Sequence, residues 1–160
     1  MTVDWLPLIL AAATVASAVV AGVFLTFSDF VMGSLAAAKP EGGIESMQII
    51  NRKVTRTLFM VLLLGLSALS PPLIGAAALF ASGPAAVWIA TGGTLYLVGV
   101  FLVSIVFNVP MNRRLDAMDP DGPEAAAYWP RYVPRWRFWN SVRALSAGGA
   151  GVCFLMAIAG

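Results

Sequence analysis

The sequence predicts an all-α protein, a four-helix transmembrane bundle that forms a single domain over residues 1–160. The first observation is composition: 59% of the residues are hydrophobic and only 11% are charged, whereas a water-soluble domain carries about 25% charged residues. The second is length, because a helix needs about 20 apolar residues to cross a bilayer. Four segments reach that length, at about 5–31, 57–81, 86–108 and 139–159.

Small side chains are concentrated in the first and fourth segments. The first contains Ala11, Ala12, Ala13, Ala18 and Gly22, and the fourth contains Ala144, Ala147, Gly148, Gly149 and Gly151. Small residues four apart let two helix backbones approach closely in lipid. We therefore expect helix contacts here, although for any single pair the abundance of Ala and Gly in membrane spans is explanation enough.

A pair of prolines interrupts the second segment. Pro71 and Pro72 each remove a backbone donor, so a kinked second helix is expected. Ser67 and Ser70 lie about one turn earlier and are candidates to bond the freed carbonyls.

The connections after the second segment are of two kinds. Ser82-Gly83-Pro84 is typical of a tight turn with a capping serine and a proline that starts the next helix, which predicts an antiparallel hairpin. Residues 116–124 are acidic and proline-rich, as in a solvated loop. After them, residues 125–132 are expected to form an amphipathic helix on the membrane surface, before the fourth span.

Every basic residue lies at one end of the expected bundle. They occupy the two long loops and the adjoining helix ends, and are Lys39, Arg52, Lys53, Arg56, Arg113, Arg114, Arg131, Arg135, Arg137 and Arg143. Loops rich in Lys and Arg stay in the cytoplasm. We therefore expect a multi-pass protein of the cell membrane with both long loops cytoplasmic and both termini outside.

Other polar residues converge on the same end. Each helix contributes to a set that comprises Asp29, Gln48, Asn51, Arg56, Asn108, Asn112, Tyr132, Trp136, Asn140 and Arg143. Polar groups that meet between the helices of a bundle can form a small-molecule site. The sequence thus predicts a site at the cytoplasmic rim.

Structural roles compete with this interpretation. A charge inside a span normally faces the bundle interior with a partner, so Asp29 and Arg143 are expected to pair, for structural or functional reasons alike. Asn108 can serve only to cap a helix. Trp129 and Trp139 are better explained by an interfacial aromatic belt.

Composition excludes several classes of site. Histidine is absent and Cys153 is the only cysteine. This rules out histidine-ligated haem, most zinc and copper sites, catalytic groups of the Ser-His-Asp or Cys-His type, and an intrachain disulfide. The net charge of +2 is too small to suggest a nucleic-acid partner. We expect neither a metal nor a cofactor.

Four ordered strings resemble the anthrone oxygenase-like family. They are FSDFVMGSLA at 27–36, GIESMQIINR at 43–52, FNVPMN at 107–112 and W-x-x-Y-x-x-x-W-x-x-WN-x-x-R at 129–143. The family consists of small four-helix membrane proteins, long catalogued as a domain of unknown function. The resemblance spans about residues 20–145 and is closest to bacterial members.

The resemblance implies oxidation of an anthrone to an anthraquinone by O₂ without a cofactor. This chemistry needs a base, a stabilised oxyanion and room for a flat ring. A buried Asp29 could be the base, with Arg143 beside the oxyanion. By residue type, the candidate substrate-binding residues are Asn51, Asn108, Asn112, Tyr132, Trp136 and Asn140.

The sequence supports two functions. One is a site that oxygenates an anthrone-like or quinone-like aromatic. The other is a non-catalytic membrane subunit that binds lipid, quinone, another membrane protein or a second copy of the chain. An enzyme requires a cavity lined by Asp29 and the asparagines, whereas a scaffold should fill that space with side chains.

The charge distribution yields a topology prediction. A reporter fused after Gly160 should be active as a phosphatase, because the C-terminus is expected outside, away from every Lys and Arg. Fluorescence from a reporter that folds only in the cytoplasm, fused at the same residue, would contradict it.

Overall fold

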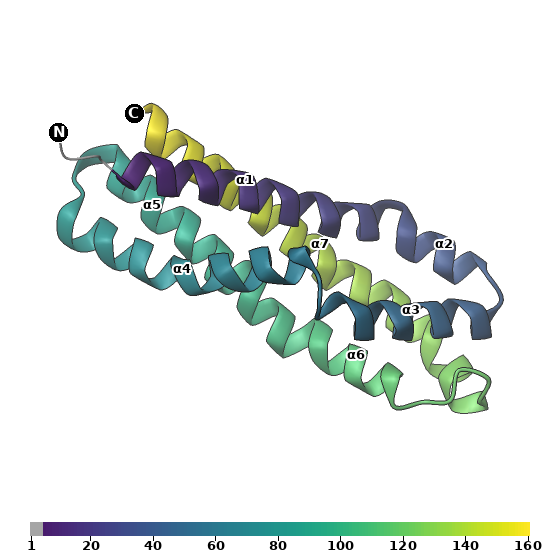
Figure 1. Cartoon of the computed structure of the whole chain (residues 1–160). Helices are drawn as coiled ribbons and strands as arrows, with labels where there is room; N and C mark the ends of the chain where they lie inside the picture. The colour runs from purple at the N-terminus through teal and green to yellow at the C-terminus, as the bar shows by residue number, and fades with distance from the viewer. Residues whose placement is uncertain (1–4) are drawn as a thin grey trace.

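The computed structural model describes residues 5–160, except for the side chain of Phe80. It is all-α, and the described residues contain four helices long and apolar enough to span a membrane. These are Trp5–Ala37, Leu58–Leu79, Gly83–Asp116 and Pro123–Ala159. The predicted four-helix transmembrane bundle is thus confirmed (Figure 1).

The long helices are built from shorter elements. The first consists of α1 (Trp5–Thr26), the π-helical η1 (Phe27–Val31) and α2 (Met32–Ala37). The separate α3 (Pro40–Val54) precedes the second, α4 (Leu58–Phe80). The third consists of α5 (Gly83–Thr94), the π-helical η2 (Leu95–Leu102) and η3 (Ser104–Asn108), and α6 (Val109–Asp116). The fourth is α7 (Pro123–Ala159).

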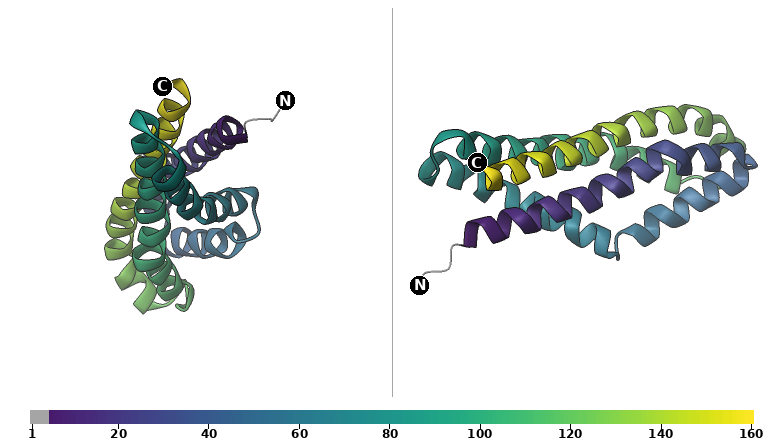
Figure 2. Two further views of the ribbon diagram at one scale, coloured as in Figure 1. Left: turned by 90° about the vertical axis from the view of Figure 1, so that its left-hand side faces the viewer. Right: turned by 90° about the horizontal axis from the view of Figure 1, so that it is seen from above.

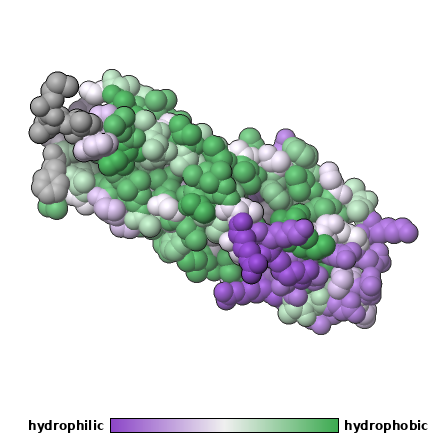
Figure 3. Space-filling model, viewed as in Figure 1, coloured by the Kyte–Doolittle hydropathy of each residue, from purple (hydrophilic) through white to green (hydrophobic). Residues whose placement is uncertain are grey.

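Three of the four helices are longer than a bilayer requires. The first, third and fourth have 33, 34 and 37 residues, whereas about 20 suffice to cross the hydrocarbon core. The surplus gathers with α3 at one end of the molecule, opposite both termini (Figures 1 and 2). We call residues 27–57 and 104–143 the polar end, because every Lys and Arg lies within them. Figure 3 shows hydrophilic side chains gathered at the end of the molecule away from both termini.

The fourth helix differs from the prediction. A separate surface helix at 125–132 was expected, but α7 runs without a break from Pro123 through Pro130 and Pro134. Trp129, Tyr132 and Trp136 lie on one buried face of it, three and four residues apart. Burial of these three side chains stabilises α7 at Pro130 and Pro134, where the backbone lacks an N–H donor.

Two hydrophobic cores divide the molecule. The first lies within the apolar spans and includes Val20, Tyr96, Val100 and Phe154. The second lies in the polar end and consists of Met32, Ile44, Met47, Leu115, Ala125, Trp129, Tyr132 and Trp136. The burial of Trp129, which is 5% exposed, shows that its assignment to an aromatic belt is wrong. The polar end therefore has a packed interior of its own.

The helix α3 joins this second core through one face. Ile44, Met47 and Gln48 are buried at helical spacing. The Gln48 side-chain amide donates to the carbonyls of Leu115 and Met118, at 2.9 Å each. These carbonyls belong to the last turn of α6 and its C-terminal extension, where carbonyls outnumber the helix's own donors. The Leu115 carbonyl also accepts from the Met118 amide at 3.2 Å, so Gln48 is an additional donor there. Gln48 thus fastens α3 to the end of the third helix.

The proline motifs are only partly as predicted. The turn at Ser82 is confirmed, since α5 begins at Gly83, whose φ is +67° and therefore suits glycine. The expected capping by the Ser82 side chain is wrong, because this side chain makes no cap hydrogen bond. In α4, however, Ser67 and Ser70 donate to the carbonyls of Leu63 and Leu66, not to those that the prolines free. The helix continues through both prolines, and the kink stays a prediction.

The close contact of α1 and α7 depends on few small residues. A Cβ placed on Gly151 would lie 3.2 Å from the Cβ of Ser17, whereas one on Gly22 would meet nothing within 4 Å. Ala13 and Ala147 are buried, but Ala11, Ala12 and Ala18 are exposed. Only part of each small-residue face is therefore a helix contact.

This packing predicts that Gly151→Val lowers the free energy of unfolding by about 1–3 kcal/mol, as overpacking does. Gly22→Val is the matched control and should have little effect, because its side chain would point into open space. The buried thiol of Cys153 can report thermal unfolding through a thiol-reactive fluorophore. Equal stability of the two variants would contradict the packing.

Candidate functional site

A cavity of about 390 Å³ opens where the polar end meets the apolar spans, between the first helix, α3, the start of α4, the third helix and α7. Five of the predicted site residues line it, and they are Asn51, Asn112, Trp136, Asn140 and Arg143. Its volume falls within the roughly 300–1,000 Å³ of small-molecule sites. A non-catalytic scaffold was expected to fill the space between these helices with side chains, and this space is open.

The walls of this polar-end cavity are mainly apolar. Aromatic rings come from Phe24, Phe27, Phe59 and Phe101, with Met47, Met60 and Leu63 beside them. The rings of Phe24 and Phe59 meet edge to face, with centroids 5.4 Å apart. Such a lining suits an apolar molecule with aromatic rings.

Asn140 connects α7 to the first helix. Its Nδ2 donates to the Phe24 carbonyl and to Ser28 Oγ, both at 2.6 Å, and its Oδ1 accepts from Arg143 Nη2 at 2.7 Å. Arg137 adds two hydrogen bonds to the Ser28 carbonyl, at 2.8 and 3.1 Å. Phe24 lies just before the π-helical turn η1 and Ser28 lies within it, where the regular helical bonding pattern is broken. Side chains of α7 therefore satisfy the backbone of this turn.

Arg143 is a buried cation that has no counter-ion among residues 5–160. Its side chain is 8% exposed, and Nη1 donates to Ser104 Oγ at 3.2 Å. The guanidinium carbon lies 4.3 Å from the centre of the Phe24 ring and 5.5 Å from that of Trp136. Its Nε is buried without an acceptor, and the ion pair found within residues 5–160 joins Arg52 to Asp116 instead. A buried charge in this state favours an anionic partner.

Asn112 presents its amide to the same cavity. Its Oδ1 accepts from the Tyr132 hydroxyl at 2.9 Å and from Trp136 Nε1 at 2.8 Å. The carbonyl is thereby occupied, and Nδ2 remains the free donor at the wall. Asn51 Nδ2 is likewise buried without an acceptor in hydrogen-bond geometry, beside the Tyr132 phenol. Arg143 and the amide nitrogens of Asn112 and Asn51 are thus free donors at this cavity.

Two predicted residues stand behind the cavity wall. Tyr132 is fully buried and supports Asn112. Asn108 is fully buried as well, and its Nδ2 donates to the Trp136 carbonyl at 3.3 Å. Neither lines the cavity. They position the wall residues, and their direct binding of a ligand stays a prediction.

The expected ion pair between Asp29 and Arg143 is wrong. Asp29 is exposed and does not line the cavity, whereas Arg143 is buried against Asn140 and Ser104. Within η1 the buried residue is Ser28, which contacts Asn140 and Ser141 of α7. Because neighbours on a helix point in different directions, Ser28 facing α7 turns Asp29 outward.

The sequence interpretation missed several lining residues. Ser104, which accepts from Arg143, had a signal: it lies four residues before Asn108 and so near it on one helix face. Asp116 lines the cavity and pairs with Arg52, with Nη1 and Oδ1 2.7 Å apart. Nothing local indicated this pair, because 64 residues separate its members.

Comparison with known proteins gives one match. Residues 52–153 match the model of a family described as anthrone oxygenase. The matched segment contains Asn112, Trp136, Asn140 and Arg143, and it leaves out α1, η1 and Asn51. No curated protein and no solved structure matches the chain.

The geometry predicts a structural role for Asn140. Asn140→Leu should lower the free energy of unfolding by about 2–4 kcal/mol, because it leaves the buried Phe24 carbonyl and an Arg143 donor unpaired. Asp29→Asn should change it by less than about 0.5 kcal/mol, as for an exposed residue. Thermal unfolding in detergent measures both free-energy changes. A larger effect of Asp29→Asn would contradict its exposed position and support an ion pair with Arg143.

Proposed function

The chain belongs to the anthrone oxygenase family, and from this premise we propose that the polar-end cavity binds a flat aromatic ketone and oxidises it with O₂. The substrate class is anthrone-like: fused apolar rings that carry one carbonyl. Its rings would occupy the space lined by Phe24, Phe27, Phe59 and Phe101, and its oxygen would lie at the free donors.

The buried guanidinium of Arg143 carries this proposal. Within the described part of the chain it has no carboxylate partner, and its Nε is free, at a cavity whose walls are otherwise mainly apolar. An anthrone that loses a proton becomes an enolate, which combines apolar rings with one negative oxygen. Donors aimed at an oxygen where charge develops stabilise such an intermediate strongly in a site shielded from water. Asn51 and Asn112 are the further donors.

The reaction balances with O₂ as the oxidant. A base removes a proton from the ring carbon opposite the carbonyl, which leaves the enolate. That carbon is oxidised as it forms a bond to O₂, and a proton converts the product into a hydroperoxide. Loss of water breaks the O–O bond and the remaining C–H bond, so the carbon becomes a second carbonyl. One anthrone and one O₂ yield one quinone and one water.

For the base, we propose Asp116 in place of Asp29. Asp116 is the carboxylate that lines the cavity, and Arg52 holds it at the rim. Asp29 is exposed and lies outside the lining. A general base must come within hydrogen-bond reach of the proton that it removes, and its place at the cavity favours Asp116.

A non-catalytic subunit that binds a quinone is the second candidate. The same cavity supports it, because a quinone carbonyl accepts hydrogen bonds from the same donors. We also propose that the polar end lies in the cytoplasm, as the basic residues indicate. Substrate would then enter from the cytoplasmic leaflet or the aqueous side.

Arg143→Met tests the proposal. It should slow the O₂-dependent conversion of added anthrone to anthraquinone by about a hundredfold or more, as the loss of an oxyanion donor does. Its stability should change little, because the lost hydrogen bonds are offset by the removal of an unpaired buried charge. Absorbance of the quinone and oxygen uptake measure the reaction in detergent.

Arg56→Met provides the matched control. Arg56 is exposed and does not line the cavity, so its loss should leave the rate unchanged. Full activity of Arg143→Met would contradict the oxyanion role. If the wild-type protein binds anthraquinone but does not accelerate anthrone oxidation, the non-catalytic function holds instead.

A further inference from the structure

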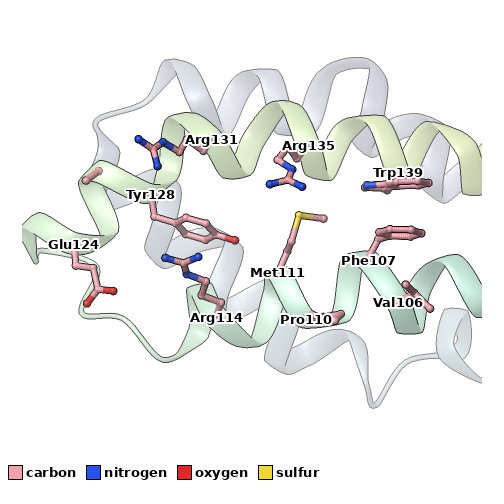
Figure 4. A pocket seen from close by; sticks show the side chains of 11 residues that line it. Val106, Phe107, Pro110, Met111, Arg114, Glu124, Tyr128, Arg131, Arg135 and Trp139 are labelled. Atoms are coloured by element: carbon pink, nitrogen blue, oxygen red, sulfur yellow. The ribbon is translucent and has the colours of Figure 1, made fainter.

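A second cavity, of about 520 Å³, lies between the end of the third helix and the first half of α7. Figure 4 shows it between the two helices, with side chains from both pointing into it. It shares no lining residue with the polar-end cavity. We call it the basic groove.

Positive charge dominates one part of this groove. Arg114, Arg131 and Arg135 line it, against a single carboxylate, that of Glu124. Arg131 and Arg135 are exposed, and within residues 5–160 no hydrogen bond or ion pair engages either of them. Arg114 lies with its guanidinium carbon 4.4 Å from the centre of the Tyr128 ring. The donors of this part are therefore largely unused.

The spacing of the arginines makes an anion favourable. Arg131 and Arg135 are four residues apart on α7, a separation at which like charges repel across one helix face. Arg114 approaches from α6 on the other side of the groove (Figure 4). An anion between the two helices would relieve this repulsion. A phosphate suits the site, because a guanidinium donates two parallel hydrogen bonds to it.

The rest of the groove is apolar. The rings of Phe107 and Trp139 stack with centroids 3.5 Å apart and an interplanar angle of 5°. They lie toward the opposite end of the groove from Arg131 and Glu124 (Figure 4). The neighbouring side chains of Val106 and Phe138 are 57% and 60% exposed, and η3 belongs to a helix able to span the membrane. The groove therefore passes from arginines to a surface suited to lipid.

We propose that the basic groove binds the headgroup of an anionic phospholipid. The phosphate lies between Arg114, Arg131 and Arg135, and the first part of an acyl chain follows Phe107 and Trp139. A free phosphate would use the same arginines and leave the apolar part empty. The continuity of the groove with the apolar span therefore favours a lipid as the source of the phosphate.

Lipid retention by the purified full-length protein tests this site. In native mass spectrometry from detergent, dioleoylphosphatidylglycerol should remain bound at least about tenfold more than dioleoylphosphatidylcholine, as charge-assisted hydrogen bonds to the arginines would give. Arg131→Gln with Arg135→Gln should abolish the preference. Lys39→Gln with Lys53→Gln removes the same charge outside the groove and should keep it.

Stability and competition complete the test. Phosphatidylglycerol should raise the Tm of the wild type and of the lysine double variant, but not that of the arginine double variant. Equal retention of the two lipids, an unchanged arginine variant, or an equal loss in the lysine variant would overturn the proposal. Competition by glycerol 3-phosphate as effective as that by the lipid would overturn the lipid assignment in favour of a soluble phosphate.

Discussion

The hydrogen bonds of Asn140 are the interaction on which the polar end depends. One amide donates to the first helix at Phe24 and Ser28 and accepts from Arg143 on its own helix. In a low-dielectric interior an unpaired amide or carbonyl is expensive. This bonding therefore sets the rotation of α7 against the first helix, and with it the side chains that reach the cavity.

The same bonds explain how the Arg143 cation is held although residues 5–160 offer it no counter-ion. Asn140, Ser104 and two aromatic rings surround the Arg143 guanidinium, and together they offset part of its desolvation. They leave Nε free. A buried donor without an acceptor lowers stability. Groups of this kind are expected at functional sites, where function overrides local stability.

The part of the molecule that packs in lipid and the part that supports the cavity lie at different positions along its length. The apolar spans pack through small contacts such as Gly151 against Ser17, and many of their large side chains face outward, where lipid can cover them. The polar end has a second core of aromatic and methionine side chains. That core supports the wall of the cavity from behind, through Tyr132 on Asn112, and also places α7 alongside α6.

The sequence by itself determined the helices, their apolar lengths and the end at which polar residues gather, because these depend on local runs of residues. It also placed Asn51, Asn112, Trp136, Asn140 and Arg143 in one region, and all five line the cavity. Only the tertiary structure decided which way each side chain faces. The π-helical turn η1 turns Ser28 inward and Asp29 outward, and pairs such as Arg52 and Asp116 form between distant segments. Helix rotation depends on packing between segments, which no local pattern contains.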